Sequence, residues 1–184
     1  MQLRFNLHRT LQAAAELLKE APAQRMNYMR LLKLLYIAER EMLAEHAQPI
    51  SGDQVVAMER GPVLSRTYDL ILGRGDGAAE WARFVRKDHF DAVLTGDPGR
   101  GQLSRAILTK LGEITVRYQD KDEWDMVEET HKLEEWRKSF APGSKSAHPM
   151  RWEDALIAQG KGRLIPEVES DERASSLFDD LVKG

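Results

Sequence analysis

The chain has 184 residues, of which 42% are hydrophobic and 31% charged, and its formal net charge is −3. This composition is typical of a soluble globular domain, and folding at this length buries enough surface that neither a metal nor a disulfide is needed for stability. The absence of cysteine excludes disulfides, zinc thiolate sites and thiol catalysis, and the slightly acidic balance disfavours a nucleic-acid binder, which usually carries a basic excess.

No segment reads as a targeting or membrane-spanning sequence. Charged residues, among them Arg4, Glu16 and Lys19, interrupt the N-terminal stretch, so no signal-peptide core fits there. The longest apolar run, residues 31–38, is short and contains Lys33. We therefore expect a cytoplasmic protein that does not enter a membrane.

Two helices are predicted at the start of the chain. Apolar residues at helical spacing predict a first helix over residues 7–18, which Ala21 and Pro22 end. A second helix begins after Asn27, a natural N-cap, and runs to about Glu45. Because the middle of this second helix is apolar nearly all round, we expect it to be the central, most buried helix.

A strand over residues 55–58 is followed by Glu59-Arg60-Gly61-Pro62. Proline is tolerated at the first helical position, where its missing N–H is harmless and its fixed φ is already correct. The stretch therefore predicts a strand-to-helix elbow, with Gly61 at the cap and Pro62 at the first position of a helix that runs to about Leu72.

The second half is predicted to contain one hairpin and a series of helices. The β-prone runs 81–85 and 90–94 are separated by charged residues and predict the hairpin. Ser104 and Asp122 are predicted N-caps of two helices, and a short helix is expected over residues 152–157.

The chain divides into a body and an acidic end. Residues 166–184 hold six acids against two bases, which leaves the rest of the chain slightly positive. No internal repeat or long linker is visible, so we expect a single domain over residues 1–165 and an acidic C-terminal segment over residues 166–184. That segment is predicted to form a final helix bearing Leu177, Phe178, Leu181 and Val182.

The expected fold class is mostly helical α+β, with a central buried helix and a small strand or hairpin element. The order helix, helix, helix, hairpin over residues 6–95 resembles a winged-helix arrangement. The N-terminal half is therefore expected to be winged-helix-like.

The sequence shows no recognisable catalytic or metal-binding motif. The five histidines lie far apart in the sequence and none belongs to a His-Glu-x-x-His pair. The glycine-rich loop 96–101 lacks the Gly-Lys-Ser/Thr ending of a phosphate-binding loop. Residues 128–136 gather acids around His131, the ingredients of a general base, but no motif places a nucleophile beside them. We interpret them as the end of an amphipathic helix with His131 half-buried and the glutamates solvated, and we expect no enzyme activity, cofactor or metal.

Three cations on the second helix, Arg30, Lys33 and Arg40, fall within one arc of about 80°. Such a stripe could face phosphates, but Glu41 projects into the same arc and Ile37 divides it. We interpret the stripe as a solvated face or a partner surface rather than as a DNA-recognition helix.

Aromatic residues are the second kind of candidate contact, because binding surfaces use exposed aromatic side chains rimmed by charge. The chain has few of them, 7% in total. Trp124 is assigned more readily to the core, and Trp81 could belong to the core or the surface. The predicted partner-binding residues are Arg30, Lys33, Arg40, Trp81, Phe84, His131 and Trp136.

Several segments together resemble a known family. They are the leucine-rich stretch 31–40, Pro49-Ile50-Ser51-Gly52-Asp53, the run 57–63 with its Gly-Pro-Val, Tyr68-Asp69, Leu103-Ser104, the run 129–136 and the stretch 152–156. In this order and at these distances they resemble the Panacea domain of the SocA-like antitoxins, over roughly residues 27–160.

The resemblance implies a non-enzymatic interaction module of bacteria and phages. Such domains are encoded beside unrelated toxins and neutralise their cognate toxin by direct protein–protein contact. The family does not name the toxin, because the same domain is paired with many different ones. Two alternatives stay open, a winged-helix-like transcriptional regulator that binds DNA and an unrecognised hydrolase, as do the oligomeric state and the role of the acidic end.

Overall fold

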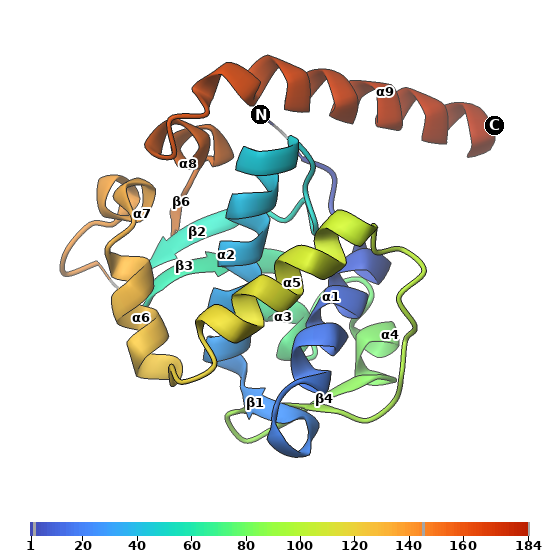
Figure 1. Ribbon diagram of the computed structural model, residues 1–184, viewed down its shortest axis with the longest axis vertical. Helices are drawn as coiled ribbons and strands as arrows, with labels where there is room; N and C mark the ends of the chain where they lie inside the picture. The colour runs from blue at the N-terminus through green and yellow to red at the C-terminus, as the bar shows by residue number, and fades with distance from the viewer. Residues whose placement is uncertain (2, 145, 184) are drawn as a thin grey trace.

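The computed structural model describes residues 1, 3–144 and 146–183, with only the backbone for residue 176 and residues 178–183. The fold is mostly helical α+β, as predicted (Figure 1). The α-helices are α1 (Leu7–Lys19), α2 (Tyr28–His46), α3 (Ser65–Ile71), α4 (Ala78–Ala82), α5 (Arg105–Arg117), α6 (Glu123–His131), α7 (Glu134–Ser139), α8 (Trp152–Ala158) and α9 (Ile165–Lys183). The strands are β1 (Arg25–Asn27), β2 (Val55–Met58), β3 (Gly61–Leu64), β4 (Val85–Asp88), β5 (Asp91–Leu94) and β6 (His148–Pro149).

Helix α2 is the centre of the molecule, as its nearly continuous apolar character predicted. The Asn27 side chain caps it by accepting a hydrogen bond from the Met29 N–H at 2.9 Å. All residues from 31 to 39 are buried, because α1, α5, α6, α8 and β3 pack around the helix (Figure 1).

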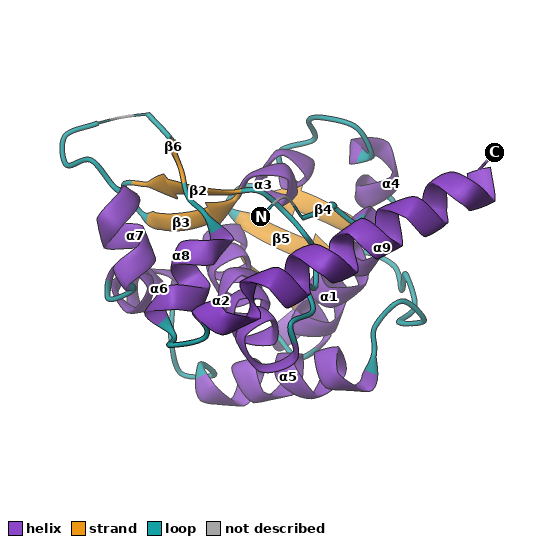
Figure 2. Cartoon of the chain, turned by 90° about the horizontal axis from the view of Figure 1, so that it is seen from above, coloured by secondary structure: helices purple, strands orange, loops and turns teal. Residues whose placement is uncertain are grey.

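The strands form two small antiparallel sheets, one in the order β1-β5-β4 and the other in the order β3-β2-β6. Figure 2 shows both sheets on one side of the helical layer that contains α1, α2 and α5. The predicted order of three helices and a hairpin is present as α1, α2, α3 and β4–β5. The structure adds β1 to that hairpin as a third strand and inserts the β2–β3 hairpin between α2 and α3.

The predicted strand-to-helix elbow is wrong. Pro62 lies in β3 opposite Ala57, and α3 begins only at Ser65. Gly61 has φ +96° and follows the Glu59-Arg60 turn, so the chain reverses into a second strand instead of entering a helix. Proline is tolerated there because β3 is an edge strand, which does not need every N–H.

The start of α3 was missed because its cap comes from a distant residue. The local cap position, Leu64, has no side-chain hydrogen bond. The carboxylate of Asp53 instead accepts hydrogen bonds from the backbone N–H groups of Arg66 at 3.0 Å and Thr67 at 2.8 Å.

The second predicted hairpin exists with shifted bounds. Its strands are β4 and β5, whereas residues 78–82 form the short helix α4.

The predicted caps of the later helices are confirmed. The Ser104 hydroxyl accepts from the Ile107 N–H, and Asp122 and Asp125 form a reciprocal capping box at the start of α6. The short helix predicted over residues 152–157 is α8.

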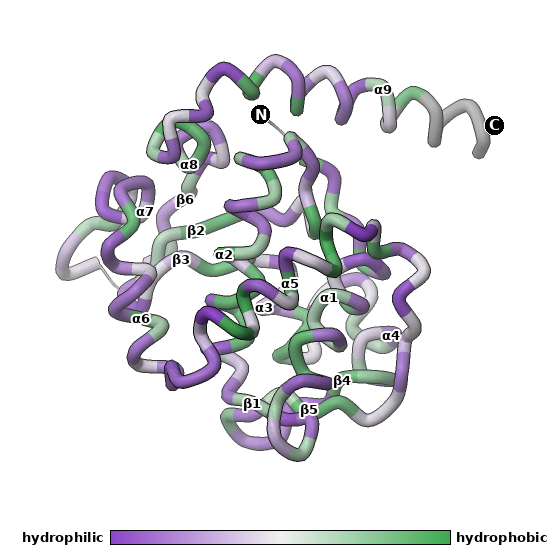
Figure 3. The backbone as a smooth tube through the Cα atoms, viewed as in Figure 1, coloured by the Kyte–Doolittle hydropathy of each residue, from purple (hydrophilic) through white to green (hydrophobic). Residues whose placement is uncertain are grey.

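Helix α9 lies along the outside of the body, and its C-terminal end extends past it (Figure 1). Mostly hydrophilic residues run along its first turns in Figure 3, but Val168 is fully buried against the body. Leu177, one of the residues that the predicted final helix bears, is 66% exposed. The side chains of Phe178, Leu181 and Val182 lie outside the described residues. Within the described part of the chain, no helix is both long and apolar enough to cross a membrane.

Candidate partner-binding groove

A buried polar network occupies the region between α2, α3, α7 and the segment 49–53, and its polar centres are Tyr36, Glu39, Arg40, Asp53 and Glu135. The Tyr36 hydroxyl donates to Glu135 Oε1 at 3.0 Å, and Arg40 Nε donates to the same oxygen at 2.5 Å. Burial, with a further contribution from Glu135, raises the pKa of the Tyr36 hydroxyl well above its usual value, so Tyr36 remains a neutral donor.

Glu135 was predicted to be solvated with its neighbouring glutamates, and that prediction is wrong. Its side chain is fully buried, because the first turn of α7 faces α2 and presents the carboxylate to Tyr36 and Arg40. A buried carboxylate requires such charged and hydrogen-bonded partners.

Two more buried carboxylates fix the segment 49–53. Glu39 accepts hydrogen bonds from three successive backbone N–H groups, those of Ile50, Ser51 and Gly52, at 2.9, 2.6 and 2.9 Å. Burial raises the pKa of Glu39, and the hydrogen bonds from Ser51 and Gly52 oppose that rise. Since Asp53 also holds the start of α3, the two carboxylates connect α2, this segment and α3.

Trp152 closes the network on the side of α8. Its ring stacks on Tyr36 with centroids 5.5 Å apart, and its Nε1 donates to the Asp53 carbonyl oxygen at 2.8 Å. Four of the segments quoted for the family resemblance, 31–40, 49–53, 129–136 and 152–156, therefore supply groups to this buried network. These residues build the fold.

The three cations of α2 do not form the solvent-exposed stripe that their spacing suggested. Arg30 Nε donates to the Lys121 carbonyl oxygen at 2.7 Å, and Arg40 pairs with Glu135. Lys33 is 1% exposed, and its Nζ donates to the Pro62 carbonyl oxygen at 2.7 Å. Helical spacing could not reveal this, because α6, α7 and the β2–β3 hairpin come from distant parts of the sequence and cover that arc.

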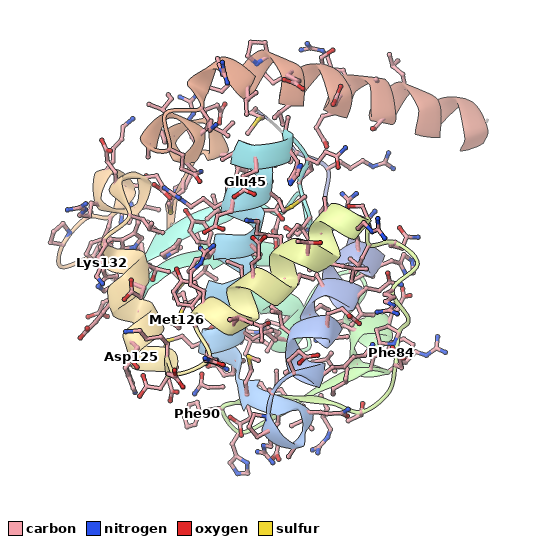
Figure 4. The ribbon with its side chains drawn as sticks, viewed as in Figure 1. Glu45, Phe84, Phe90, Asp125, Met126 and Lys132 are labelled. Atoms are coloured by element: carbon pink, nitrogen blue, oxygen red, sulfur yellow. The ribbon has the colours of Figure 1, made fainter. Side chains whose placement is uncertain are left out.

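The predicted aromatic contact residues and His131 differ in their exposure to solvent. Trp81 is 1% exposed and Trp136 7%, and the Trp136 Nε1 donates to the Met58 carbonyl oxygen at 3.0 Å. His131 is half-buried, as predicted, with its ring stacked on Trp136 at 4.0 Å. Burial lowers the pKa of His131. Phe84 is half-buried, and Figure 4 shows it on a different side of the molecule from Phe90.

A groove of about 730 Å³ opens beside the first turns of α2. We call it the aromatic groove. Its walls include Tyr28, Leu32 and Lys33 from α2, Met58 and Arg60 from the β2–β3 hairpin, and Tyr68 from α3. This volume lies within the range of sites that hold ligands or side chains of a partner.

The rim of the aromatic groove carries two large exposed aromatic side chains. Phe90, at the β4–β5 turn, is 70% exposed, and Trp124, in the first turn of α6, is 53% exposed. Figure 4 shows Phe90 at the same edge of the molecule as Asp125, the residue after Trp124. The Arg60 guanidinium lies over the Trp124 ring, 5.0 Å from its centroid. Inside, the Tyr28 and Tyr68 rings are 6.2 Å apart.

The sequence interpretation missed this rim and assigned Trp124 to the core. Two local signals could have found it. Trp124 is off the buried stripe of α6, which consists of Met126, Val127 and Thr130. Phe90 directly follows the charged residues 86–89 that separate the two β-prone runs, which places it at the tip of the hairpin, where a side chain has few neighbours.

Lys33 gives the groove an unusual charge. Among the described residues, no carboxylate oxygen lies within 4 Å of its Nζ, and Pro62 is its only hydrogen-bond partner. Burial lowers the pKa of this ammonium from 10.5 to about 7. The groove wall therefore contains a buried amine that is about half protonated near pH 7 and that has no counterion among the described residues.

A second hollow of about 730 Å³ lies between residues 4–9 and α9. Charged and polar side chains, such as Arg4, Arg9, Asp171 and Glu172, dominate its lining. Its lining has no exposed aromatic side chain among the described residues, so the aromatic groove is the stronger candidate for binding a protein.

The fold and the groove define a mostly helical α+β protein whose buried network supports one aromatic surface. The family model of the antitoxin SocA-like, Panacea domain matches residues 31–137, which is more than half of the chain. The chain belongs to this family. No curated protein and no solved structure matches it. The matched residues include most walls of the aromatic groove, from Leu32 to Trp124.

Proposed function

We propose that this protein is an antitoxin that binds a cognate toxin by direct protein–protein contact in the cytoplasm, and that the aromatic groove is the contact surface. The observation that carries the proposal is the pair of exposed rings, Phe90 and Trp124, over an apolar groove. Exposed aromatic anchors beside a pocket are the residues that contribute most to protein interfaces.

Other exposed apolar residues support the choice of this surface by contrast. Val116 on α5, Ile157 on α8 and Leu177 on α9 are 67%, 60% and 66% exposed. They are aliphatic, and each is on a different helix. Isolated surface aliphatics of this kind are normal in monomeric proteins and need no partner.

Neutralisation by this route requires no catalysis. Replacing His131 with Gln tests that part of the proposal, since His131 is the residue around which the sequence gathers acids. We expect a normally folded His131→Gln protein to protect cells as well as the unchanged protein does. A folded His131→Gln protein that fails to protect would contradict a purely binding role.

Co-expression tests the main proposal. We expect the protein encoded by the adjacent gene to arrest growth when expressed alone, and co-expression with this chain to restore growth and to yield a co-purifying complex. Rescue without a physical complex would contradict direct neutralisation, and so would an adjacent gene whose product does not inhibit growth.

A further inference from the structure

Several cations around the aromatic groove lack a nearby carboxylate among the described residues. Lys33 is buried in its wall, and no carboxylate of the described residues lies within 4 Å of its Nζ. Arg60 and Lys87 lie over the rings of Trp124 and Tyr28. Within the described residues, neither of these two cations has a carboxylate within 4 Å.

Two acids, Glu59 and Glu123, also line the groove. The Glu123 carboxylate already has one partner within the chain, because it accepts a hydrogen bond from the Asn27 side chain at 3.3 Å. Neither acid lies within 4 Å of Lys33, Arg60 or Lys87. The groove therefore keeps three basic side chains near its aromatic walls, and within the described residues none of them has a carboxylate within 4 Å.

We propose that the aromatic groove receives a segment of the toxin in which an apolar or aromatic side chain lies next to an Asp or Glu. The apolar side chain packs between Tyr28, Tyr68 and the rim ring of Trp124. The carboxylate faces the side of the groove formed by Lys33 and Arg60. This inference rests on the proposed function, because it takes the occupant to be the protein that the antitoxin neutralises.

The expected preference of the groove for a carboxylate is electrostatic. Two opposite charges attract several times more strongly in a partly buried site than in water, and salt screens them less there. A buried ammonium without a counterion is costly, so an incoming carboxylate that supplies one binds better than a neutral isostere. An amide of the same shape would fill the groove without that gain.

Three synthetic peptides provide the test: capped Leu-Trp-Glu-Glu-Leu, the same peptide with Gln-Gln, and the same peptide with Lys-Lys at the central positions. Each is titrated into the full chain, and binding is followed through the amide and Trp indole resonances. We expect the Glu-Glu peptide to bind about tenfold more tightly than the Gln-Gln peptide and the Lys-Lys peptide to bind most weakly. The shifted resonances should include the Trp124 indole.

Single substitutions test whether these cations cause the preference for the Glu-Glu peptide. In Lys33→Met and Arg60→Gln the ratio of the Gln-Gln to the Glu-Glu dissociation constant should fall towards one, while the Gln-Gln peptide keeps its affinity. Arg163→Gln is the control, because Arg163 is an exposed cation outside the groove. Two variants are used so that a folding defect in either one leaves the test intact.

Equal binding of the Glu-Glu and Gln-Gln peptides would overturn the inference, as would shifts confined to another surface or no binding of any peptide. If the toxin complex nevertheless forms and depends on Trp124, the proposed function stands and only the carboxylate preference fails. If no complex with the adjacent gene's product forms, the proposed function fails independently of the peptide result.

Discussion

The buried polar network and the aromatic groove are neighbours around α2, but they use polar groups in opposite ways. In the network, the carboxylates of Glu39, Asp53 and Glu135 are all satisfied by donors from distant segments. In the groove wall, Lys33 is buried with one carbonyl partner and no counterion. A satisfied network stabilises one conformation, whereas an uncompensated charge beside exposed rings favours a ligand.

The largest expected effect comes from the network, at Tyr36. Its ring is fully buried against Trp152, and its hydroxyl holds Glu135. Tyr36→Ala should lower the free energy of unfolding by about 3–5 kcal/mol, as expected for deleting a buried aromatic side chain. Tyr36→Phe, which removes only the hydroxyl, should cost about 1–2 kcal/mol. Denaturant titration measures both, and a loss below about 1 kcal/mol for Tyr36→Ala would mean that Tyr36 does not support the core.

A smaller loss is expected when only a charge is removed from the network. Glu135→Gln keeps the shape of the side chain but leaves Arg40 without its carboxylate. Because the Arg40 side chain is 15% exposed and water can partly compensate, we expect a loss of about 2–3 kcal/mol. The matched control is Glu134→Gln on the exposed side of the same helix, which should change stability by less than about 0.5 kcal/mol. Equal effects of the two substitutions would contradict the burial of Glu135.

Lys33 in the groove wall should make the free energy of unfolding depend on pH. The pKa of Lys33 is about 7 in the folded protein and 10.5 in its ordinary state. Between these values the unfolded chain binds more protons than the folded one, so Lys33 makes stability rise with pH, by at most about 1.4 kcal/mol per pH unit. Below about pH 7 both states are protonated and the slope from Lys33 disappears.

Lys33→Met isolates this contribution, because methionine fills similar space without charge. We expect Lys33→Met to be as stable as the unchanged protein or up to about 3 kcal/mol more stable at pH 7. The stability of Lys33→Met relative to that of the unchanged protein should fall as the pH rises from about 7 to 9. Denaturation curves at several pH values measure the difference, and parallel pH profiles would show that Lys33 is not a buried cation.

The sequence predicted those features that depend on near neighbours. The caps Asn27, Ser104 and Asp122 act within three residues of themselves, so their helices were placed correctly. The central helix was evident because its apolar character does not depend on which elements surround it. The resemblance to the antitoxin family was likewise carried by local stretches, and the family match confirms it.

Features set by distant segments were predicted poorly. Pro62 belongs to a strand because β2 pairs with β3, and the helix that follows is capped by Asp53 from before that hairpin. Lys33 is buried because the hairpin covers it, although its spacing placed it on a cationic stripe. The aromatic groove gathers residues from Tyr28 to Trp124, so no single stretch of sequence could reveal it.

Substitutions of the rim residues Phe90 and Trp124 should change stability least and toxin binding most. Phe90 and Trp124 make their apolar surfaces available to solvent, so Phe90→Ala and Trp124→Ala should change the free energy of unfolding by about 0.5 kcal/mol or less. Val116→Ala and Ile157→Ala are matched controls that shorten equally exposed apolar side chains on α5 and α8. None of the four substitutions should disturb the buried polar network.

The most direct measurement is the dissociation constant of the complex with the toxin encoded by the adjacent gene, for the unchanged protein and these four variants. We expect the combined losses of affinity in Trp124→Ala and Phe90→Ala to amount to at least about thirtyfold, or about 2 kcal/mol. Val116→Ala and Ile157→Ala should leave the affinity unchanged. Unaltered affinity in the Phe90→Ala and Trp124→Ala variants, or a loss confined to the Val116→Ala or Ile157→Ala variant, would contradict the aromatic groove as the toxin-binding surface.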